Sequence, residues 1–250
     1  MNSFDNSHGT RLFNRDSEID GLINEIAGRF PAQGLTTLFP QLIRRTWLKK
    51  FVAHYELFRR IRDLDGDLVE LGVFRGLSLF SFALFNEFAG NKKRTVYGVD
   101  NFAGFTEIHA EDGQEYDVPK FAGGFSPARY YEELMMLVEA FNASAQRTRI
   151  EIVRGNVEDV TDSIVAKTGA LSLVHFDVDL YIPTKAGLEA FYPLLVEGGV
   201  FLFDEYACIE WAGESKAVDE YFADKDILLK KFPWQGAPTA YLVKGEGGAQ

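Results

Sequence analysis

The chain has 250 residues, of which 46% are hydrophobic and 25% charged, enough for one α/β domain or two small ones with a sizeable core. Its formal net charge of -11 argues against nucleic acid as a partner, because contact with a phosphate backbone needs clustered Lys and Arg. The single cysteine, Cys208, excludes an intrachain disulfide and thiolate metal sites. No apolar run has the length of a membrane span and the N-terminus is not a signal peptide, so we expect a cytoplasmic protein.

The N-terminal part is predicted to be separate from the sheet. Residues 1–16 are polar and are expected to be disordered. Residues 17–62 show apolar positions near helical spacing and are predicted to form a helical lid or an oligomerisation segment. We interpret the basic run RRTWLKK, at 44–50, as a solvated helix face, with contact to an anionic ligand group as the alternative.

From residue 63 to residue 245 the pattern is that of one α/β domain. Short apolar runs alternate with helical patterns, which predicts parallel strands covered by helices on both faces. The strand-like runs are 67–72, 94–100, 148–155, 171–179 and 198–205, and the helical patterns are 77–89, 130–141, 157–169 and 183–198.

The last part of this domain has a different pattern. Two further strand-like runs, 226–232 and 239–244, are joined by a link too short for a parallel crossover. We therefore expect seven strands, ending in a C-terminal antiparallel hairpin. The segment 104–130 is a long irregular excursion after the second strand, and its length is typical of a lid or binding loop.

The first strand runs into a glycine-bearing turn, DLVELGVFRGLSLF. Gly72 permits a tight turn, and Gly76 permits close approach at the start of the next helix. Phe74 stands where a dinucleotide-binding GxGxxG motif has its second glycine, and there is no P-loop. A turn of this kind suits a nucleoside that carries no phosphate, of which S-adenosylmethionine (SAM) is the common one. Glu70 is then placed to support the cationic methionine end.

Two further strand ends offer groups for the same nucleoside. Asp100 ends the second strand, where an acidic side chain accepts ribose hydroxyls, although a role in a turn or helix cap is the alternative. Gly155, Asn156 and Val157 follow the third strand and are placed to flank an adenine. Ligands bind at the carboxyl ends of parallel strands, and all of these residues fall there.

Acidic residues follow the fourth and fifth strands: Asp177, Asp179, Asp204 and Glu205. We expect these two strands to be neighbours, so the carboxylates converge. Gathering carboxylates in one cleft is unfavourable unless a cation neutralises them. Oxygen ligands with no His or Cys nearby favour Mg²⁺, followed by Mn²⁺ or Ca²⁺. The alternative is that such acids cap helices and bind backbone amides, and for Asp179 both interpretations are equally open.

Aromatic and imidazole side chains nearby have less specific interpretations. Tyr181 and Tyr206 either form a wall of the substrate site or are ordinary half-buried tyrosines. We interpret His175, within the fourth strand, as a buried core histidine. His109 lies in the 104–130 excursion, where a role as ligand or base is a minor alternative.

Four stretches together resemble the macrocin O-methyltransferase family: DLVELGVFRGLSLF, YGVDNFAGF, HFDVDLYIPTKAGLEAFYPLLVEGGVFLFDEY and WAGESKAVDEYF. These are SAM-dependent sugar O-methyltransferases of antibiotic and polysaccharide pathways. The resemblance runs from about Trp47 to Lys244. The DxDLYxPTK, FDE and WxGE strings are most similar to the calicheamicin deoxysugar O-methyltransferase subgroup.

The resemblance implies a Rossmann-like class I methyltransferase fold, and it implies roles for particular residues. Mg²⁺ would be held by Asp177, Asp204 and Glu205, with Asp177 also the general base. Many relatives carry Asp-Asp where this chain has Asp204-Glu205. The residues implied to face SAM are Glu70, Gly72, Ser78, Asp100 and Asn156.

The expected reaction is methylation of a sugar hydroxyl, on a sugar nucleotide or a glycoside, by a protein that is a dimer or larger. Catechol-type methyltransferases share the metal set but carry a lysine three residues after the first aspartate, where this chain has Leu180. A phenolic or other small-molecule acceptor is the nearest alternative. An NAD-dependent oxidoreductase and a non-catalytic nucleoside-binding domain are the alternatives of another class.

Overall fold

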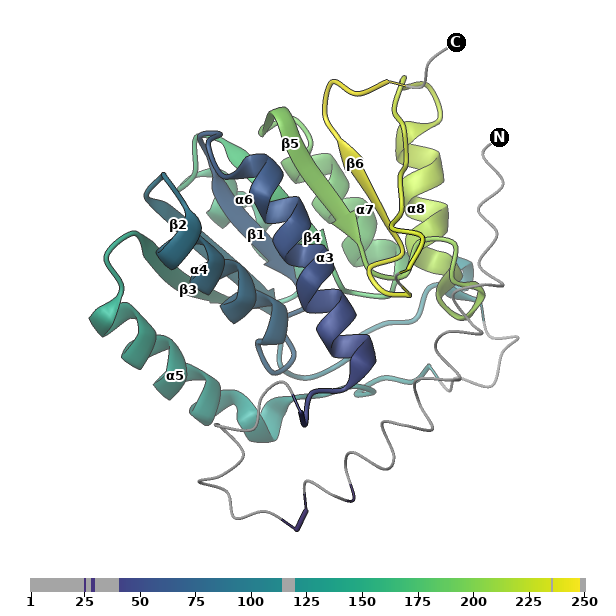
Figure 1. Cartoon of the computed structure of the whole chain (residues 1–250). Coiled ribbons are helices and arrows are strands. Elements are labelled where there is room, and N and C mark those ends of the chain that lie inside the picture. The colour runs from purple at the N-terminus through teal and green to yellow at the C-terminus, as the bar shows by residue number, and fades with distance from the viewer. Residues whose placement is uncertain (1–24, 26–27, 30–40, 114–119, 235, 248–250) are drawn as a thin grey trace.

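The computed structural model describes residues 25, 28–29, 41–113, 120–234 and 236–247 as one sheet with helices on both faces (Figure 1). The N-terminal tail that was predicted to be disordered lies outside the described residues. Within the described part, no helix is long and apolar enough to cross a membrane.

The described residues form a six-stranded sheet with the order β3-β2-β1-β4-β5-β6. The first five strands are parallel, and β6 pairs with β5 antiparallel. The predicted parallel sheet with an antiparallel pair at its end is therefore confirmed. The strands are β1 (Asp67–Leu71), β2 (Arg94–Asp100), β3 (Thr148–Arg154), β4 (Leu171–Phe176), β5 (Leu195–Phe203) and β6 (Ala240–Val243).

The prediction of seven strands is wrong, because the run 226–232 makes only an isolated bridge. Lys230 and Tyr241 exchange two backbone hydrogen bonds of 2.8 Å, and the pairing goes no further. The chain reaches Pro233 soon afterwards, and proline has no N–H with which to extend a ladder. The edge of the sheet beyond β6 is thus covered by a loop instead of a strand.

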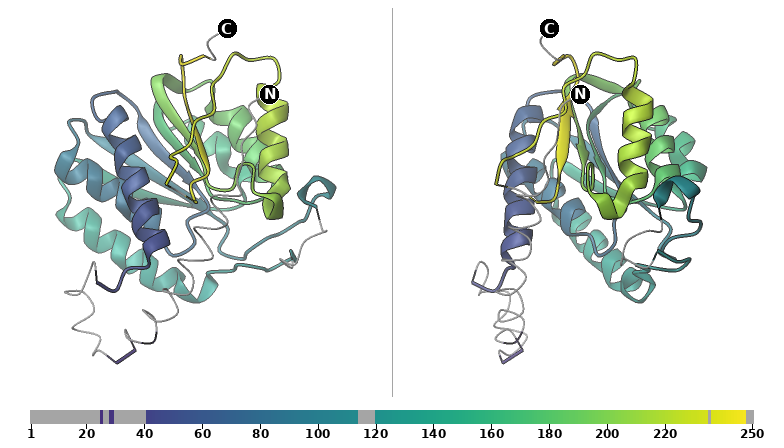
Figure 2. Two further views of the ribbon diagram at one scale, coloured as in Figure 1. Left: turned by 45° about the vertical axis from the view of Figure 1, so that its right-hand side comes forward. Right: turned by 90° about the vertical axis from the view of Figure 1, so that its right-hand side faces the viewer.

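Six helices of the described residues form two layers, one on each face of the sheet (Figure 2). The layer with α3, α4 and α5 contains the N-terminal helix. The opposite layer contains α6, α7 and α8. Their bounds are α3 (Arg45–Ile61), α4 (Leu77–Ala89), α5 (Tyr131–Ser144), α6 (Val157–Val165), α7 (Tyr181–Phe191) and α8 (Ala212–Phe222), with short 3₁₀ turns η1 (Ala110–Asp112), η2 (Ala128–Tyr130) and η3 (Ile209–Trp211).

Strand side chains alternate between two buried clusters, as a pleated sheet requires. On β1, Leu68 packs under the α3 layer while Val69 packs under the α7 layer. Many of the 22 phenylalanines are found here, and burying one completely contributes about 1.5–3 kcal/mol. The largest fully buried side chains include Phe58, Phe82 and Phe85 on the first side and Phe176, Phe191, Phe201 and Phe203 on the second.

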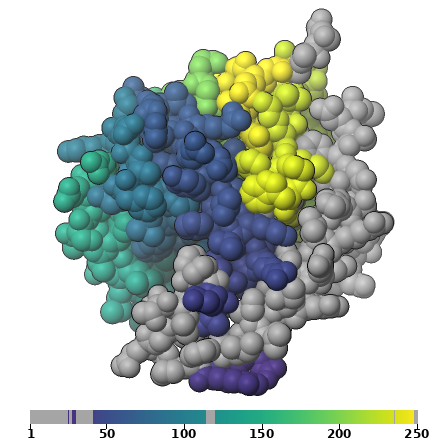
Figure 3. All heavy atoms as spheres, in the orientation of Figure 1, coloured from purple at the N-terminus to yellow at the C-terminus, as the bar shows by residue number. Residues whose placement is uncertain are grey.

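Helix α3 crosses the sheet near β4 and β5, between α4 and the C-terminal segment (Figure 3). Lys50 lies on the same helix face as the fully buried Leu57 and as His54, at helical spacing. Its side chain is 14% exposed and points inward, toward the strand ends. For Lys50, the interpretation of the basic run as a solvated helix face is therefore wrong.

Candidate active site

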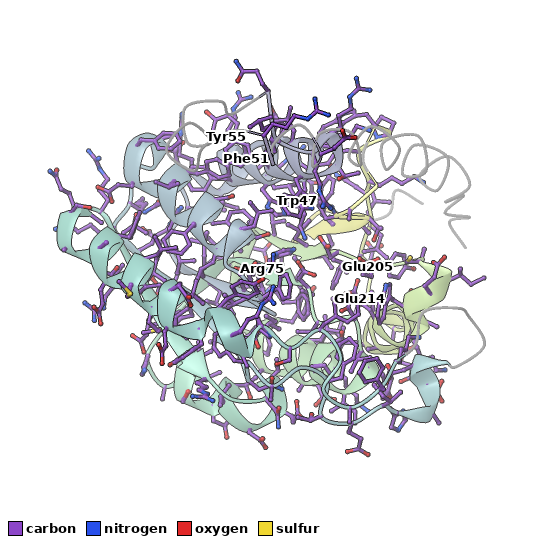
Figure 4. All side chains as sticks on the ribbon, turned by 90° about the horizontal axis from the view of Figure 1, so that it is seen from below. Trp47, Phe51, Tyr55, Arg75, Glu205 and Glu214 are labelled. Atoms are coloured by element: carbon purple, nitrogen blue, oxygen red, sulfur yellow. The ribbon has the colours of Figure 1, made fainter. Side chains whose placement is uncertain are left out.

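A cavity of about 730 Å³ lies at the carboxyl ends of the parallel strands. Figure 4 looks toward this end of the molecule, where Trp47, Arg75 and Glu205 surround the opening. The volume is typical of a small-molecule site. The residues predicted from sequence that line it are Glu70, Gly72, Ser78, Asp100, Asn156, Val157, Asp177, Asp179 and Glu205.

The glycine turn brings β1 and β4 together at the cavity. Gly72 has a left-handed backbone (φ +86°), and its N–H donates to the carbonyl of Val99 at 2.9 Å. Gly76 also has a positive φ, and a Cβ there would lie 2.8 Å from Leu134 of α5. Gly76 therefore allows two helices to pack, and it is not among the described residues that line the cavity.

Glu70 places a buried carboxylate at the base of the cavity. It is 2% exposed, and burial raises its pKa. One oxygen, Oε1, lies 3.4 Å from Nδ1 of His175. The other, Oε2, has no hydrogen-bond partner among the described residues. An unsatisfied buried acceptor is costly, so a cationic amine such as the methionine end of SAM would complete this position.

Asp100 lines the cavity and also holds the turn. Its carboxylate accepts backbone hydrogen bonds from Val73 at 3.0 Å, Phe74 at 2.8 Å and Phe102 at 2.7 Å. Burial raises its pKa, although these three bonds oppose the shift. The structure therefore shows the turn role that the sequence left open.

Asn156 lines the cavity and immediately precedes α6. Its Oδ1 accepts a 2.8 Å hydrogen bond from Asn101, which follows β2. Its Nδ2 donates to Asp159 at 3.1 Å. Gly155 and Val157 line the same part of the cavity. The hydrogen bond between Asn101 and Asn156 thus ties the ends of β2 and β3 together at the cavity.

Asp177 and Asp204 follow the adjacent strands β4 and β5, and both contact Lys50. Its Nζ lies 2.7 Å from Oδ2 of Asp177 and 2.8 Å from Oδ2 of Asp204. Burial alone would lower the pKa of Lys50, but the two carboxylates raise it. Burial alone would raise the pKa of Asp204, but the charge of Lys50 and the contact with His175 lower it.

His175 lies between the cofactor side and the carboxylate side of the site. It is fully buried, 3.4 Å from Glu70 and 3.4 Å from Oδ1 of Asp204. Burial favours the neutral ring, but the two acids raise its pKa to about 9. His54 of α3 packs against it with ring centroids 4.9 Å apart. This position matches the interpretation of His175 as a core histidine, here one that carries charge between two acids.

Further acids crowd this region, and their carboxyl groups raise one another's pKa. Burial, together with Asp177 and Asp204, raises the pKa of Asp179 to about 8. Burial and its acidic neighbours also raise the pKa of Glu205 and of Glu214. Figure 4 shows these two glutamates side by side, and the backbone N–H of Glu205 donates to Glu214 at 2.9 Å. Lys50 contacts two of the five carboxyl groups gathered here, those of Asp177 and Asp204.

The predicted metal ligands were Asp177, Asp204 and Glu205. Asp177 and Asp204 both contact the ammonium of Lys50. Asp177 and Glu205 line the cavity, whereas Asp204 is not among the described residues that line it. Among the described residues, the acidic and imidazole sets with ligand atoms within 4.8 Å of one another are Glu70–His175–Asp177 and His54–His175–Asp204, which leave out Glu205. Both sets contain His175, so the expectation that no histidine lies near the carboxylates is wrong. The carboxylate oxygens of Asp177, Asp204 and Glu205 are donors of the kind that a hard divalent cation prefers.

The two tyrosines predicted to form a substrate wall lie elsewhere. The hydroxyl of Tyr181 donates to Glu220 at 2.7 Å, and that of Tyr206 donates to Asp219 at 2.8 Å. Neither is among the described residues that line the cavity. His109 of the 104–130 segment stacks on Tyr181 and accepts a hydrogen bond from the N–H of Glu111, which gives it a structural role.

Sequence reasoning missed Lys50 and a group of aromatic residues. Phe105, Phe125 and Trp211, here called the aromatic rim, line the cavity with ring centroids 5.6–6.0 Å apart. The rim joins the 104–130 segment to the turn before α8. The helical spacing of Lys50 to Trp47 and His54 was a signal that could have placed Lys50 on the buried helix face. Nothing in the sequence indicated that the three rings of the aromatic rim lie together.

Residues 41–232 match the macrocin O-methyltransferase family. The chain is 28% identical to a tetracenomycin-type rhamnosyl 4'-O-methyltransferase of Streptomyces olivaceus, over 79% of this chain and 76% of that protein. The calicheamicin methyltransferase CalS11 superposes with a TM-score of 0.80 at 28% identity, over 92% and 93% of the two chains. The O-methyltransferase NovP shares the fold, with a TM-score of 0.61 at 22% identity over 80% and 81%. Since the family match covers well over half of its length, the protein belongs to the macrocin O-methyltransferase family.

Proposed function

We propose that the protein transfers the methyl group of SAM to a hydroxyl of a sugar, in the form of a sugar nucleotide or a glycoside, in antibiotic biosynthesis. The proposal depends on one observation: a single cavity is lined both by the residues predicted to hold a nucleoside, such as Glu70 and Asn156, and by the acidic residue Asp177. The similar proteins support both forms of acceptor. One is named for a rhamnosyl group on a tetracenomycin, and CalS11 is named as a TDP-rhamnose 3'-O-methyltransferase.

We infer that SAM lies along the strand ends. Glu70, whose Oε2 lacks a partner among the described residues, would accept hydrogen bonds from the methionine ammonium. Asp100 would accept from the ribose, and Asn156 and Val157 would flank the adenine. This placement points the methyl group toward Asp177, because Gly72 holds the backbone of β1 against that residue.

The metal part of the proposal involves Asp177, Asp204 and Glu205, with Mg²⁺ or Mn²⁺ as the ion. When bound, a divalent cation would hold two adjacent hydroxyls of the acceptor and lower their pKa. It would also offset the charge of acids that burial and mutual repulsion otherwise keep protonated, among them Glu205.

The chain's own contribution to the reaction is orientation and proton transfer. Asp177, which is 27% exposed at its side chain, would take the hydroxyl proton. The acceptor oxygen then forms a bond to the methyl carbon as the carbon–sulfur bond breaks, leaving S-adenosylhomocysteine. Holding the two reactants in line removes much of the entropic barrier. Asp179, beside Asp177, would support the acceptor hydroxyls.

The test has two parts. Calorimetry with SAM and S-adenosylhomocysteine checks the cofactor, and absence of binding to either would overturn the assignment. A panel of nucleotide-sugars, glycosides and phenols, assayed for S-adenosylhomocysteine release, then identifies the acceptor. The panel is run with Mg²⁺ and with EDTA on the wild type and on Asp204→Asn. Full turnover of the variant under both conditions would overturn the metal part, and turnover of phenols alone would overturn the sugar acceptor.

A further inference from the structure

We propose that Lys50 is a counter-ion built into the chain that keeps the cation position between Asp177 and Asp204 filled, and that a divalent cation binds by displacing its ammonium group. This rests on the metal part of the proposed function. It adds that the protein carries an internal competitor for its own metal site, supplied by a helix outside the sheet.

The two cations would need the same oxygen atoms. Oδ1 of Asp204 faces Nε2 of His175 at 3.4 Å, so Oδ2 is the oxygen left for a cation. Lys50 takes this atom at 2.8 Å, and it takes Oδ2 of Asp177 at 2.7 Å. A divalent cation held by Asp177 and Asp204 would therefore compete with the Lys50 ammonium for these oxygens.

Because these side chains are buried, we expect the position to hold either the Lys50 ammonium or a divalent cation, but not both. The side chains of Lys50 and Asp204 are 14% and 5% exposed, so water screens little of the charge between them. An ammonium and a dication bound to the same two oxygens would repel each other at close range. Conversely, removing the ammonium without a replacement leaves two carboxylates facing each other, with Asp179 and Glu205 beside them. The site is expected to hold one cation or the other.

The cavity can accommodate the Lys50 ammonium after it leaves the two carboxylates. Its four-carbon stem is flexible, and Lys50 itself lines the cavity, as does Trp47 one turn earlier on α3. The ammonium can therefore swing into the cavity while α3 stays packed by Leu57, Phe58 and Ile61, which are fully buried. No movement of the helix is required.

The test measures Mn²⁺ affinity, by electron paramagnetic resonance and by calorimetry, without any acceptor. Lys50→Met keeps the length of the side chain and removes its charge. Mn²⁺ should bind at least about tenfold more tightly to this variant than to the wild type, because the competitor is gone. In EDTA the variant should melt at a lower temperature than the wild type, and Mn²⁺ should raise its Tm by more. Lys49→Met removes the same charge one residue away and should change neither quantity.

Unchanged or weaker Mn²⁺ binding by Lys50→Met overturns the proposal, as does an equal gain in Lys49→Met, which would show a general charge effect. If Lys50→Met does not fold in EDTA, Lys50→Gln serves, with the same direction expected. If neither the wild type nor the variant binds Mn²⁺, the displacement is wrong. S-adenosylhomocysteine titration of the same samples then shows separately whether the cofactor assignment stands.

Discussion

Gly72 and Asp177 touch through their backbones, at the point where the cofactor half of the cavity meets the acidic half. A Cβ added to Gly72 would lie 1.9 Å from the carbonyl oxygen of Asp177, well inside any contact distance. The N–H of Asp177 in turn donates to the carbonyl of Leu71 at 2.9 Å. Asp177, which we propose as the base, is thus positioned by the turn that we propose to hold SAM.

Replacing Gly72 with Ala should therefore damage both stability and cofactor binding. The left-handed backbone alone costs about 1–2 kcal/mol for a residue with a side chain, and the overlap with Asp177 adds to it. Urea unfolding should show a loss larger than that range, and calorimetry should show weaker binding of S-adenosylhomocysteine.

Gly169→Ala is the matched control. Gly169 has no positive φ, and nothing in the described structure lies within 4 Å of a Cβ placed there. Its replacement should leave the free energy of unfolding within about 0.5 kcal/mol of the wild type, as for ordinary surface sites. Similar losses in the two variants would show that the contact between Gly72 and Asp177 does not constrain the turn.

Glu70→Gln should weaken SAM binding more than it weakens the fold. The substitution keeps the shape but removes the charge that would face the methionine ammonium. A hydrogen bond to a charged group contributes about 1.5–3 kcal/mol, so the dissociation constant should rise about 10- to 150-fold. Titration with SAM measures it. Glu132→Gln, an exposed change on α5, is the control, and equal affinities in the two variants would contradict the role given to Glu70.

The parts of the fold that could be predicted from sequence are those that depend on patterns within a short stretch of chain. Alternating apolar runs and helices gave the parallel sheet, and the short link at 233–238 gave the antiparallel end. The same kind of apolar run led to one strand too many, at 226–232. A strand-like composition does not guarantee that a neighbouring strand has free backbone groups with which to pair. Whether Lys230 pairs once or the whole run pairs is decided by the turn at Pro233 and by the neighbouring β6.

The residues of the candidate site that could be predicted from sequence are those that follow the ends of strands. Asp100, Asn156 and Asp177 each follow an apolar run, so their common location follows from the topology of a parallel sheet. Lys50 was not accessible in this way, because its contact with Asp177 joins positions 127 residues apart through the placement of α3. Tyr181 shows the converse, because closeness in sequence does not place it at the site. It lies two residues from Asp179, but it begins a helix and its hydroxyl donates to Glu220.

Glu87 should make the stability of the fold depend on pH. Its carboxylate accepts backbone hydrogen bonds from Gln146, Arg147 and Thr148 at 2.8–3.0 Å, at the start of β3. Burial opposes the shift, but these bonds lower its pKa below the ordinary value of 4.5. A depressed carboxyl pKa stabilises the folded state above the unfolded pKa, and the effect is lost as pH falls through the folded pKa.

Glu87→Gln should accordingly be less stable than the wild type at pH 7, by about 1 kcal/mol after discounting for solvent screening. The gap should shrink as the pH drops below about 4.5. Urea unfolding at pH 7 and at lower pH measures both values, with Glu139→Gln, exposed on α5, as the control. A gap of the same size at every pH would show that the carboxylate charge is not what holds the start of β3.

Trp211→Ala should raise the KM for the acceptor and leave cofactor affinity unchanged. The indole packs against Phe105 and Phe125 at centroid distances of 5.9 and 6.0 Å and lines the cavity. An apolar face of this kind can cover the C–H face of a sugar ring or an aglycone, away from the residues proposed to hold SAM. Loss of one aromatic contact corresponds to a KM about three- to tenfold higher.

Trp234→Ala provides the comparison for the aromatic rim. Trp234 packs on Phe232 with ring centroids 5.2 Å apart and is not among the described residues that line the cavity. It removes an equally large ring, so any effect of lost bulk on stability appears in both variants. Only Trp211→Ala should change the KM for the acceptor. If S-adenosylhomocysteine affinity falls together with acceptor binding in this variant, the rim covers the cofactor and the acceptor must enter elsewhere along the acidic half of the cavity.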